Sequence, residues 1–226
     1  MTTSVHHRLA AAGVLMLGLA LAGCSSIRSA DVNASGFLGD LSDLRTPDSP
    51  TEARGFLKNP DVLSRYDTFI VDPVLVYFAP DAEGTAVEPG ELAELAAYLH
   101  DEVVRELESG GYVVVTEPGP GVLRIRTALT DVGSSRPALN VAAKVAGTVT
   151  TGAGFLVPVL DVGHAAIEVE MRDAVTAERL VAYMDAKRGK RFGGTMDAAS
   201  TWGHARSAFR SWAKGFREHL DEARRR

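Results

Sequence analysis

The chain of 226 residues has one cysteine, Cys24, and so cannot form an internal disulfide. Its N-terminal apolar run, residues 9–20, is shorter than the roughly 20 residues that a transmembrane helix needs. The formal net charge is −5, which argues against nucleic-acid binding because contacts to phosphates need clustered cations. The sequence has no Gly-x-Ser-x-Gly motif, no Walker or dinucleotide-binding pattern and no zinc-ligand spacing. It therefore predicts no catalytic, cofactor-binding or metal site.

Residues 1–23 have the layout of a secretory signal peptide. A short basic region at positions 6–8 precedes the apolar run, and small residues precede the expected cut between Gly23 and Cys24. In a secreted protein, a single cysteine has no partner for an internal disulfide, so another role has to account for it. One alternative is an ordinary cleaved signal with an unrelated cysteine near the cut.

The motif Leu21-Ala22-Gly23-Cys24 resembles the lipobox of bacterial lipoproteins. In that family the cysteine thiol is alkylated with diacylglycerol, the preceding peptide is removed, and the new N-terminus is usually acylated with a fatty acid such as palmitate. The resemblance implies that Cys24 is the lipidation site and holds the protein on a membrane, because two or three acyl chains anchor stably.

The residues after the cysteine predict where the protein lies. Ser25 resembles the outer-membrane class of lipoproteins, since an Asp at this position favours inner-membrane retention in enteric bacteria. Residues 24–35 are small and polar and predict a flexible tether. Residues 36–226 are enough for a single periplasmic domain with its own core. We therefore expect a lipid-anchored protein of the cell envelope, on the periplasmic face of the outer membrane.

Apolar periodicity predicts the elements of this domain. Strands are predicted at residues 68–78, 112–116, 122–132, 165–173 and 180–187, preceded by an N-terminal arm over residues 36–61. Two helices are predicted from apolar side chains spaced by three and four: Leu92, Leu95, Ala96, Leu99, Val103 and Leu107, then Trp202, Ala205, Phe209, Trp212, Phe216 and Leu220. The order predicts an α+β fold, in which both helices pack on one face of a mainly antiparallel sheet of four to five strands.

The second face of this sheet is predicted to be half solvated. Arg124 and Arg126 alternate with apolar residues, and so do Glu168 and Glu170, which suggests cross-strand ion pairs at the surface. Tyr183 and Asp185 would share a solvated face with Val181 and line a shallow groove. Pro73 within a strand suggests an edge position or a bulge.

Several short motifs, in order, resemble one protein family. They are Ser35-Gly36-Phe37-Leu38-Gly39-Asp40, Ile70-Val71-Asp72-Pro73-Val74, Glu117-Pro118-Gly119-Pro120-Gly121-Val122-Leu123-Arg124, Thr130-Asp131-Val132, and a last helix with Trp202. Together, over about residues 24–220, they are similar to the bacterial lipoproteins of domain-of-unknown-function family 3313. This resemblance implies a lipoprotein of Gram-negative bacteria and leaves the activity open.

Residues 139–163 contain only two charged side chains, Lys144 and Asp161, among small and apolar residues. One interpretation is an insertion that touches the membrane or forms oligomers. The other, which we prefer, is a small-residue connection packed on the sheet, because glycines and Pro158 interrupt the segment. Lys144 and Pro158 also interrupt any clean membrane-spanning stretch.

The polar residues form no recognisable catalytic set. His100 beside Asp101 is typical of a solvated helix position, and Asp72 of a bulge or turn. The other histidines of the predicted domain, His164, His204 and His219, lack ligand spacing. We therefore predict a binding or assembly module without enzymatic activity. It would contact envelope proteins, or itself, through sheet edges or residues 139–163. The alternatives are a periplasmic enzyme with an unrecognised pocket and an oligomeric membrane-contacting assembly through residues 139–163.

Overall fold

The computed structural model describes residues 34–42, 44, 53–59, 61–134, 163–188 and 200–225. The predicted signal peptide, Cys24, the tether up to residue 33 and residues 139–162 lie outside these ranges. The extent of the predicted domain, residues 36–226, stays a prediction. Among the described residues, no helix is both long and apolar enough to span a membrane.

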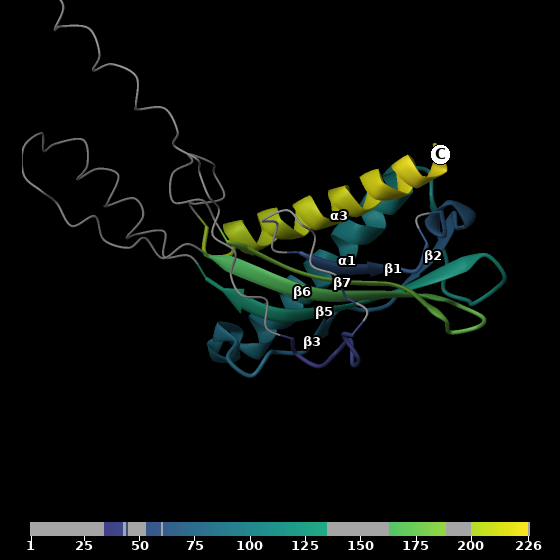
Figure 1. The fold of residues 1–226 in the computed structure, drawn as a ribbon. Helices are drawn as coiled ribbons and strands as arrows, with labels where there is room; N and C mark the ends of the chain where they lie inside the picture. Colours follow the sequence, from purple (N-terminus) through teal and green to yellow (C-terminus); the bar gives the residue numbers. More distant parts are fainter. Residues whose placement is uncertain are drawn as a thin grey trace, which may run out of the picture.

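The described residues form a seven-stranded sheet with two helices on one face (Figure 1). The strands are β1 (Arg54–Leu57), β2 (Thr68–Val71), β3 (Leu75–Val76), β4 (Val113–Val114), β5 (Val122–Gly133), β6 (His164–Asp173) and β7 (Arg179–Arg188). The helices are α1 (Pro89–Ser109) and α3 (Gly203–Arg224), and two 3-10 turns are η1 (Leu63–Arg65) and η2 (Glu83–Ala86). Their arrangement confirms the α+β class and the placement of both helices on one side.

The strand order is β1-β7-β6-β5-β2-β4, and β3 also pairs with β5. The longest strands, β5, β6 and β7, pair antiparallel, whereas β5 pairs in parallel with β2 and β3, and β2 with β4. The prediction of four to five strands is therefore wrong: the sheet is larger and mixed. Pro73 breaks one predicted strand into β2 and β3, and β1 arises from the predicted arm.

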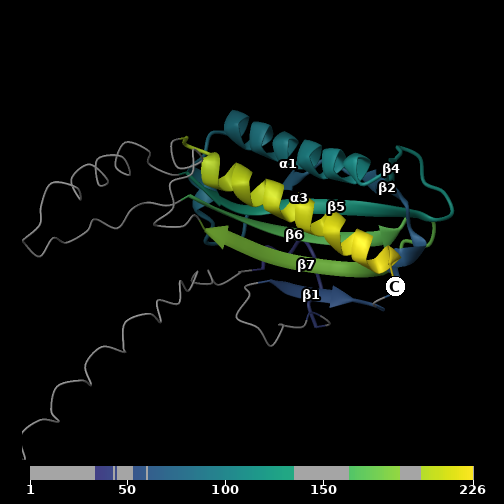
Figure 2. The ribbon, with the colours of Figure 1, turned by 90° about the horizontal axis from the view of Figure 1, so that it is seen from above.

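The helices bury the first face of the sheet. Seen from above in Figure 2, α1 lies over the β2–β4 side, and α3 crosses β5, β6 and β7. Phe69, Leu99 and Phe209 are fully or almost fully buried between the layers. Pro89 occupies the first turn of α1, where its missing N–H costs nothing, and the apolar stripes predicted for both helices face the core.

The second face is covered in part by an N-terminal segment, residues 34–42 and 44, which lies opposite the helices (Figure 1). Leu38 packs there against Ala182 and Met184 of β7. Glu168 and Glu170 are 0% and 2% exposed, so the prediction of a half-solvated face is wrong at these positions. The predicted arm over the domain is confirmed for the described residues of this segment.

Tyr183 and Asp185 lie on the helix side of β7, not on a solvated face. Asp185 accepts hydrogen bonds from Trp212 Nε1 at 2.6 Å and from the Tyr183 hydroxyl at 2.9 Å. Asp185 is 6% exposed. The predicted shallow groove at these residues is therefore wrong, because α3 covers this side of β7.

Candidate functional site

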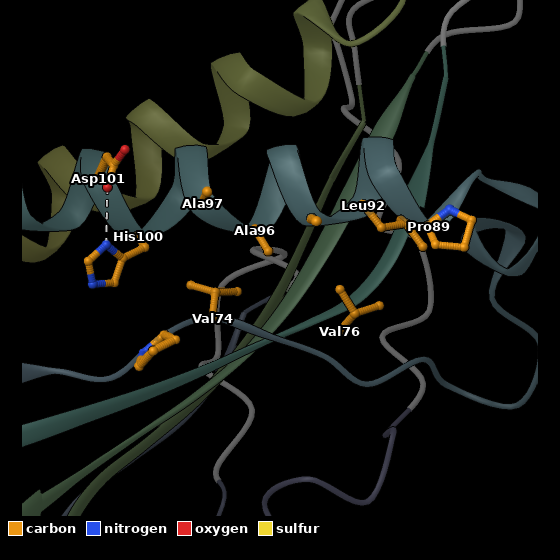
Figure 3. Close-up of a pocket in the computed structure, with 10 residues that line it drawn as sticks. Val74, Val76, Pro89, Leu92, Ala96, Ala97, His100 and Asp101 are labelled. Carbon is orange, nitrogen blue, oxygen red and sulfur yellow. Dashed lines mark hydrogen bonds and ion pairs between the residues drawn. The ribbon is translucent and has the colours of Figure 1, made fainter.

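An elongated groove runs between α1 and β3 (Figure 3). Its volume is about 580 Å³, and its lining is almost entirely apolar: Pro73, Val74, Val76, Pro89, Leu92, Ala93, Ala96, Ala97, His100 and Asp101. Val74 and Val76 form the strand side, and Leu92 and Ala96 form the helix side. The groove exists because α1 presents alanines at this point, where larger side chains would fill the space.

The strand side of the groove is an open sheet edge. Tyr77 N donates to Leu129 O at 3.0 Å, so the amide of its neighbour Val76 points away from β5. Within the described ranges, no strand pairs with this outer side of β3. Leu75, Val76 and Tyr77 are 47%, 39% and 47% exposed. An exposed edge with apolar side chains is a template for an extended partner segment.

His100 and Asp101 form the polar end of the groove. His100 Nδ1 lies 3.1 Å from Asp101 Oδ1, and His100 Nε2 lies 3.4 Å from Val71 O. The histidine therefore bridges α1 to β2. The sequence predicted a solvated helix position, and the structure places the residue at the groove instead.

A second polar cluster joins β5, β6 and η2. Asp131 Oδ2 lies 3.0 Å from His164 Nε2, and Asp131 Oδ1 accepts the amides of Gly84 and Val132 at 3.0 and 2.8 Å. Although burial raises the pKa of Asp131, the hydrogen bonds from His164 and from both amides prevail and hold it below its ordinary value. A Cβ on Gly133 would lie 2.2 Å from His164 Cε1, so the imidazole ring leaves no room for a side chain at position 133.

The Asp131–His164 pair was missed from the sequence because 33 residues separate its members. His164 is 6% exposed, and Asp131 also binds two backbone amides. The pair thus ties three elements together where β5 ends and β6 begins. Among the described residues, no group of three or more His, Cys, Asp or Glu side chains is placed to hold a metal ion.

Glu168 fastens the N-terminal segment to the second face. Its Oε1 accepts the Ser35 amide at 2.6 Å, and its Oε2 accepts the Leu38 amide at 3.1 Å. Arg179 adds hydrogen bonds to the carbonyls of Leu38 and Asp40 at 2.8 and 3.0 Å. We call residues 35–40, held in this way, the latch. The last predicted tether residue, Ser35, thus belongs to the folded body.

The arginines beside the latch are partly exposed. Arg126 pairs with Glu170, which confirms one predicted cross-strand pair, and Arg172 joins the same carboxylate. Arg124 pairs with Asp72 at 3.4 Å instead of with a β6 glutamate. The side chains of Arg124 and Arg126 are each 40% exposed. The carboxylate that Arg126 and Arg172 share is buried, whereas the two arginine side chains are 40% and 35% exposed.

Comparison with known proteins gives one family and several relatives. The family model of proteins of unknown function, DUF3313, matches residues 33–216. The uncharacterized lipoprotein YdcL of Escherichia coli K12 is 33% identical over 139 residues, and so is that of Escherichia coli O157:H7. The match covers 58% of this chain and 61% of each relative, so the chain spans about three fifths of their length.

The matches among solved structures are more distant. A PelC dodecamer from Paraburkholderia phytofirmans is 12% identical, with a TM-score of 0.40 over 74% of this chain and 95% of that one. A minor lipoprotein from Acinetobacter baumannii is 8% identical, with a TM-score of 0.33 over 70% of this chain and 95% of that one.

Proposed function

Because this chain belongs to the DUF3313 family of proteins of unknown function, we propose that it is a lipid-anchored lipoprotein of the bacterial cell envelope. The relatives described as lipoproteins support this proposal, and so does the Leu21-Ala22-Gly23-Cys24 motif. Signal peptide 1–23 would be removed, and Cys24 would carry the diacylglyceryl and acyl groups. Ser25 favours the periplasmic face of the outer membrane.

The anchor predicts a clear result for Cys24→Ala. Full-length wild-type chain, expressed in a Gram-negative host with labelled palmitate, should incorporate label and partition into detergent. The variant should carry no label, because it lacks the thiol that is alkylated, and should remain unprocessed or appear as a soluble product. Ser25→Ala, which keeps the thiol, serves as the matched control and should be labelled like wild type. Unchanged labelling of the Cys24→Ala variant would contradict the anchor.

The body of the protein is, in this proposal, a binding or assembly module without catalytic activity. The observation that carries it is the apolar groove beside the open edge of β3. An enzyme site is expected to bring acid, base and other polar groups together in a concave pocket. The polar side chains of this groove are instead confined to His100 and Asp101 at one end. Such a groove suits an extended apolar segment of an envelope protein.

The groove is tested by photo-crosslinking in intact cells. A photoreactive residue in place of Ala93, which lines the groove and is exposed, should capture a discrete partner. Adding Ala97→Trp should fill the groove and reduce capture by about tenfold or more, the equivalent of about 1.4 kcal/mol. The same photoreactive residue at Lys214, on the exposed side of α3, is the control and should capture no such partner. Capture that is equal at both positions, or insensitive to Ala97→Trp, would reject the groove as the binding site.

A further inference from the structure

The latch determines where the chain from Cys24 joins the folded body. Ser35 and Leu38 are fixed to Glu168, a side chain with no exposed surface in the middle of β6. Cys24 lies 11 residues before Ser35, a length that spans at most about 40 Å when fully extended. An anchor at Cys24 therefore attaches to the second face of the sheet, the side opposite α1 and α3 (Figure 1).

Exposed apolar side chains lie next to the latch on this same face. The rings of Tyr77 and Phe37 are 6.3 Å apart, which puts Tyr77 on the side of the sheet that the latch covers. Leu75 precedes Tyr77 by two residues on the extended chain and so points the same way. Both Leu75 and Tyr77 are 47% exposed, although each is large and apolar.

Cationic side chains lie on the same face, two of them on β5 next to β3 and one on β1 at the opposite edge of the sheet. The Arg126 guanidinium lies 5.2 Å from the centre of the Phe37 ring, and Arg124 projects from the same face of β5 two residues earlier. Arg54, opposite Met184 in the β1–β7 register, is exposed on this face as well. Guanidinium groups bind phosphate oxygens through two parallel hydrogen bonds, which makes arginine well suited to phosphate groups.

Helix α1, on the opposite side of the sheet, presents acidic side chains to solvent. The exposed residues of α1 include four carboxylates, at Glu91, Glu94, Asp101 and Glu108. Anionic lipid head groups would repel this helix and attract the arginine-bearing face. An approach to anionic lipid with α1 foremost is therefore unfavourable, whereas α3 has exposed cations of its own, Lys214, Arg224 and Arg225.

We propose that the second face, with Leu75, Tyr77, Arg124, Arg126 and Arg54, lies on the anionic phospholipid surface in which Cys24 is anchored. This inference rests on the proposed lipid anchor. Leu75 and Tyr77 enter the interfacial region, where aromatic and aliphatic side chains are favoured, and the arginines bind lipid phosphates. A short linker holds the face at an effective concentration of about millimolar, so individually weak contacts are enough. The groove beside α1 then remains open to the periplasm.

The orientation is measured with lipidated protein reconstituted in vesicles of phosphatidylethanolamine and phosphatidylglycerol that contain a nitroxide-labelled lipid. Lipidation blocks the thiol of Cys24, so an added cysteine is the only reactive one. A fluorophore on Leu75→Cys should be quenched several-fold more than the same fluorophore on Lys214→Cys, whose side chain is exposed on α3. Equal quenching at the two positions, or stronger quenching at Lys214, would overturn the inference.

Charge neutralisation provides the second measurement. Arg124→Gln combined with Arg54→Gln should reduce the quenching at position 75, and neither change strands a buried carboxylate, because the side chain of Asp72 is 31% exposed. Arg225→Gln, at the end of α3, is the matched control and should leave the quenching unchanged.

Intact-mass analysis separates the two proposals. A mature chain without fatty substituents would overturn the anchor and this inference with it, whereas a lipidated Cys24 with an unquenched label at 75 would overturn the inference alone.

Discussion

Phe209→Ala is expected to lower the free energy of unfolding by about 3–5 kcal/mol, the range for truncating a buried phenylalanine. Phe209 has no exposed surface, and its ring lies between Trp212 at 6.0 Å and Tyr98 at 6.4 Å, measured between ring centres. It therefore joins α3 to α1 as well as to the sheet. A small domain has only about 5–15 kcal/mol of stability in total, so urea unfolding followed by circular dichroism should show a large shift of the midpoint.

Two substitutions calibrate this result. Phe209→Leu keeps most of the apolar volume and should cost clearly less, about 1–2 kcal/mol. Val175→Ala lies in the exposed β6–β7 turn, where the side chain is 62% exposed, and should change stability by no more than about 0.5 kcal/mol. A loss below about 1 kcal/mol for Phe209→Ala would mean that α3 does not share the core of the sheet, since truncating a buried phenylalanine ring costs about 3–5 kcal/mol.

Periodicity was sufficient to predict the long elements. Leu92 and Leu99 of α1 and Phe209 of α3 each belong to a stripe with helical spacing, and all three are buried between the helices and the sheet. Ile125 and Ile167 alternate with charged residues along β5 and β6, and both face the helices as predicted. These patterns are reliable because each element has one face that the core dictates over ten or more residues.

The pattern failed where both faces of a strand are buried. In β7, Ala182 and Met184 lie beneath the latch, whereas Tyr183 and Asp185 pack against α3. Because both sets of side chains are buried, alternation alone could not show which set of β7 faces the helices. The two-residue strand β3 is too short to show a period of its own. The strand predicted at residues 112–116 is found as β4.

The buried glutamates could not be predicted because their partners are remote in sequence. Charged residues that alternate with apolar ones usually face water, and Glu168 was interpreted that way. Its partners, the amides of Ser35 and Leu38, are 130 or more residues away. A signal was nevertheless present in the motif Ser35-Gly36-Phe37-Leu38-Gly39-Asp40. Gly36 and Gly39 have φ of +98° and +67°, so the motif encodes a tight turn that only glycine adopts readily.

Glu168→Ala should therefore release the latch and lower the free energy of unfolding by about 2–4 kcal/mol. Two amides that the carboxylate satisfies would lose their acceptor, and each unsatisfied buried donor costs about 1–3 kcal/mol. Hydrogen exchange followed by mass spectrometry should show the amides of Ser35 and Leu38 exchanging much faster, while amides in the middle of β5 stay protected. The loss of stability in Glu168→Gln should be smaller than in Glu168→Ala but larger than zero. Its amide oxygen accepts one hydrogen bond, whereas its NH₂ group cannot accept the other.

Glu178→Ala is the control for removing an acidic side chain. Glu178 pairs with Lys58 and is half exposed, so its loss should cost about 0–1 kcal/mol and leave exchange at Ser35 unchanged. Slow exchange at Ser35 and Leu38 in Glu168→Ala would contradict the role of this carboxylate.

Release of the latch also has a consequence at the membrane. With Ser35 free, the first fixed point of the chain moves away from the second face, and a lipid anchor would no longer hold Leu75 and Tyr77 against the bilayer.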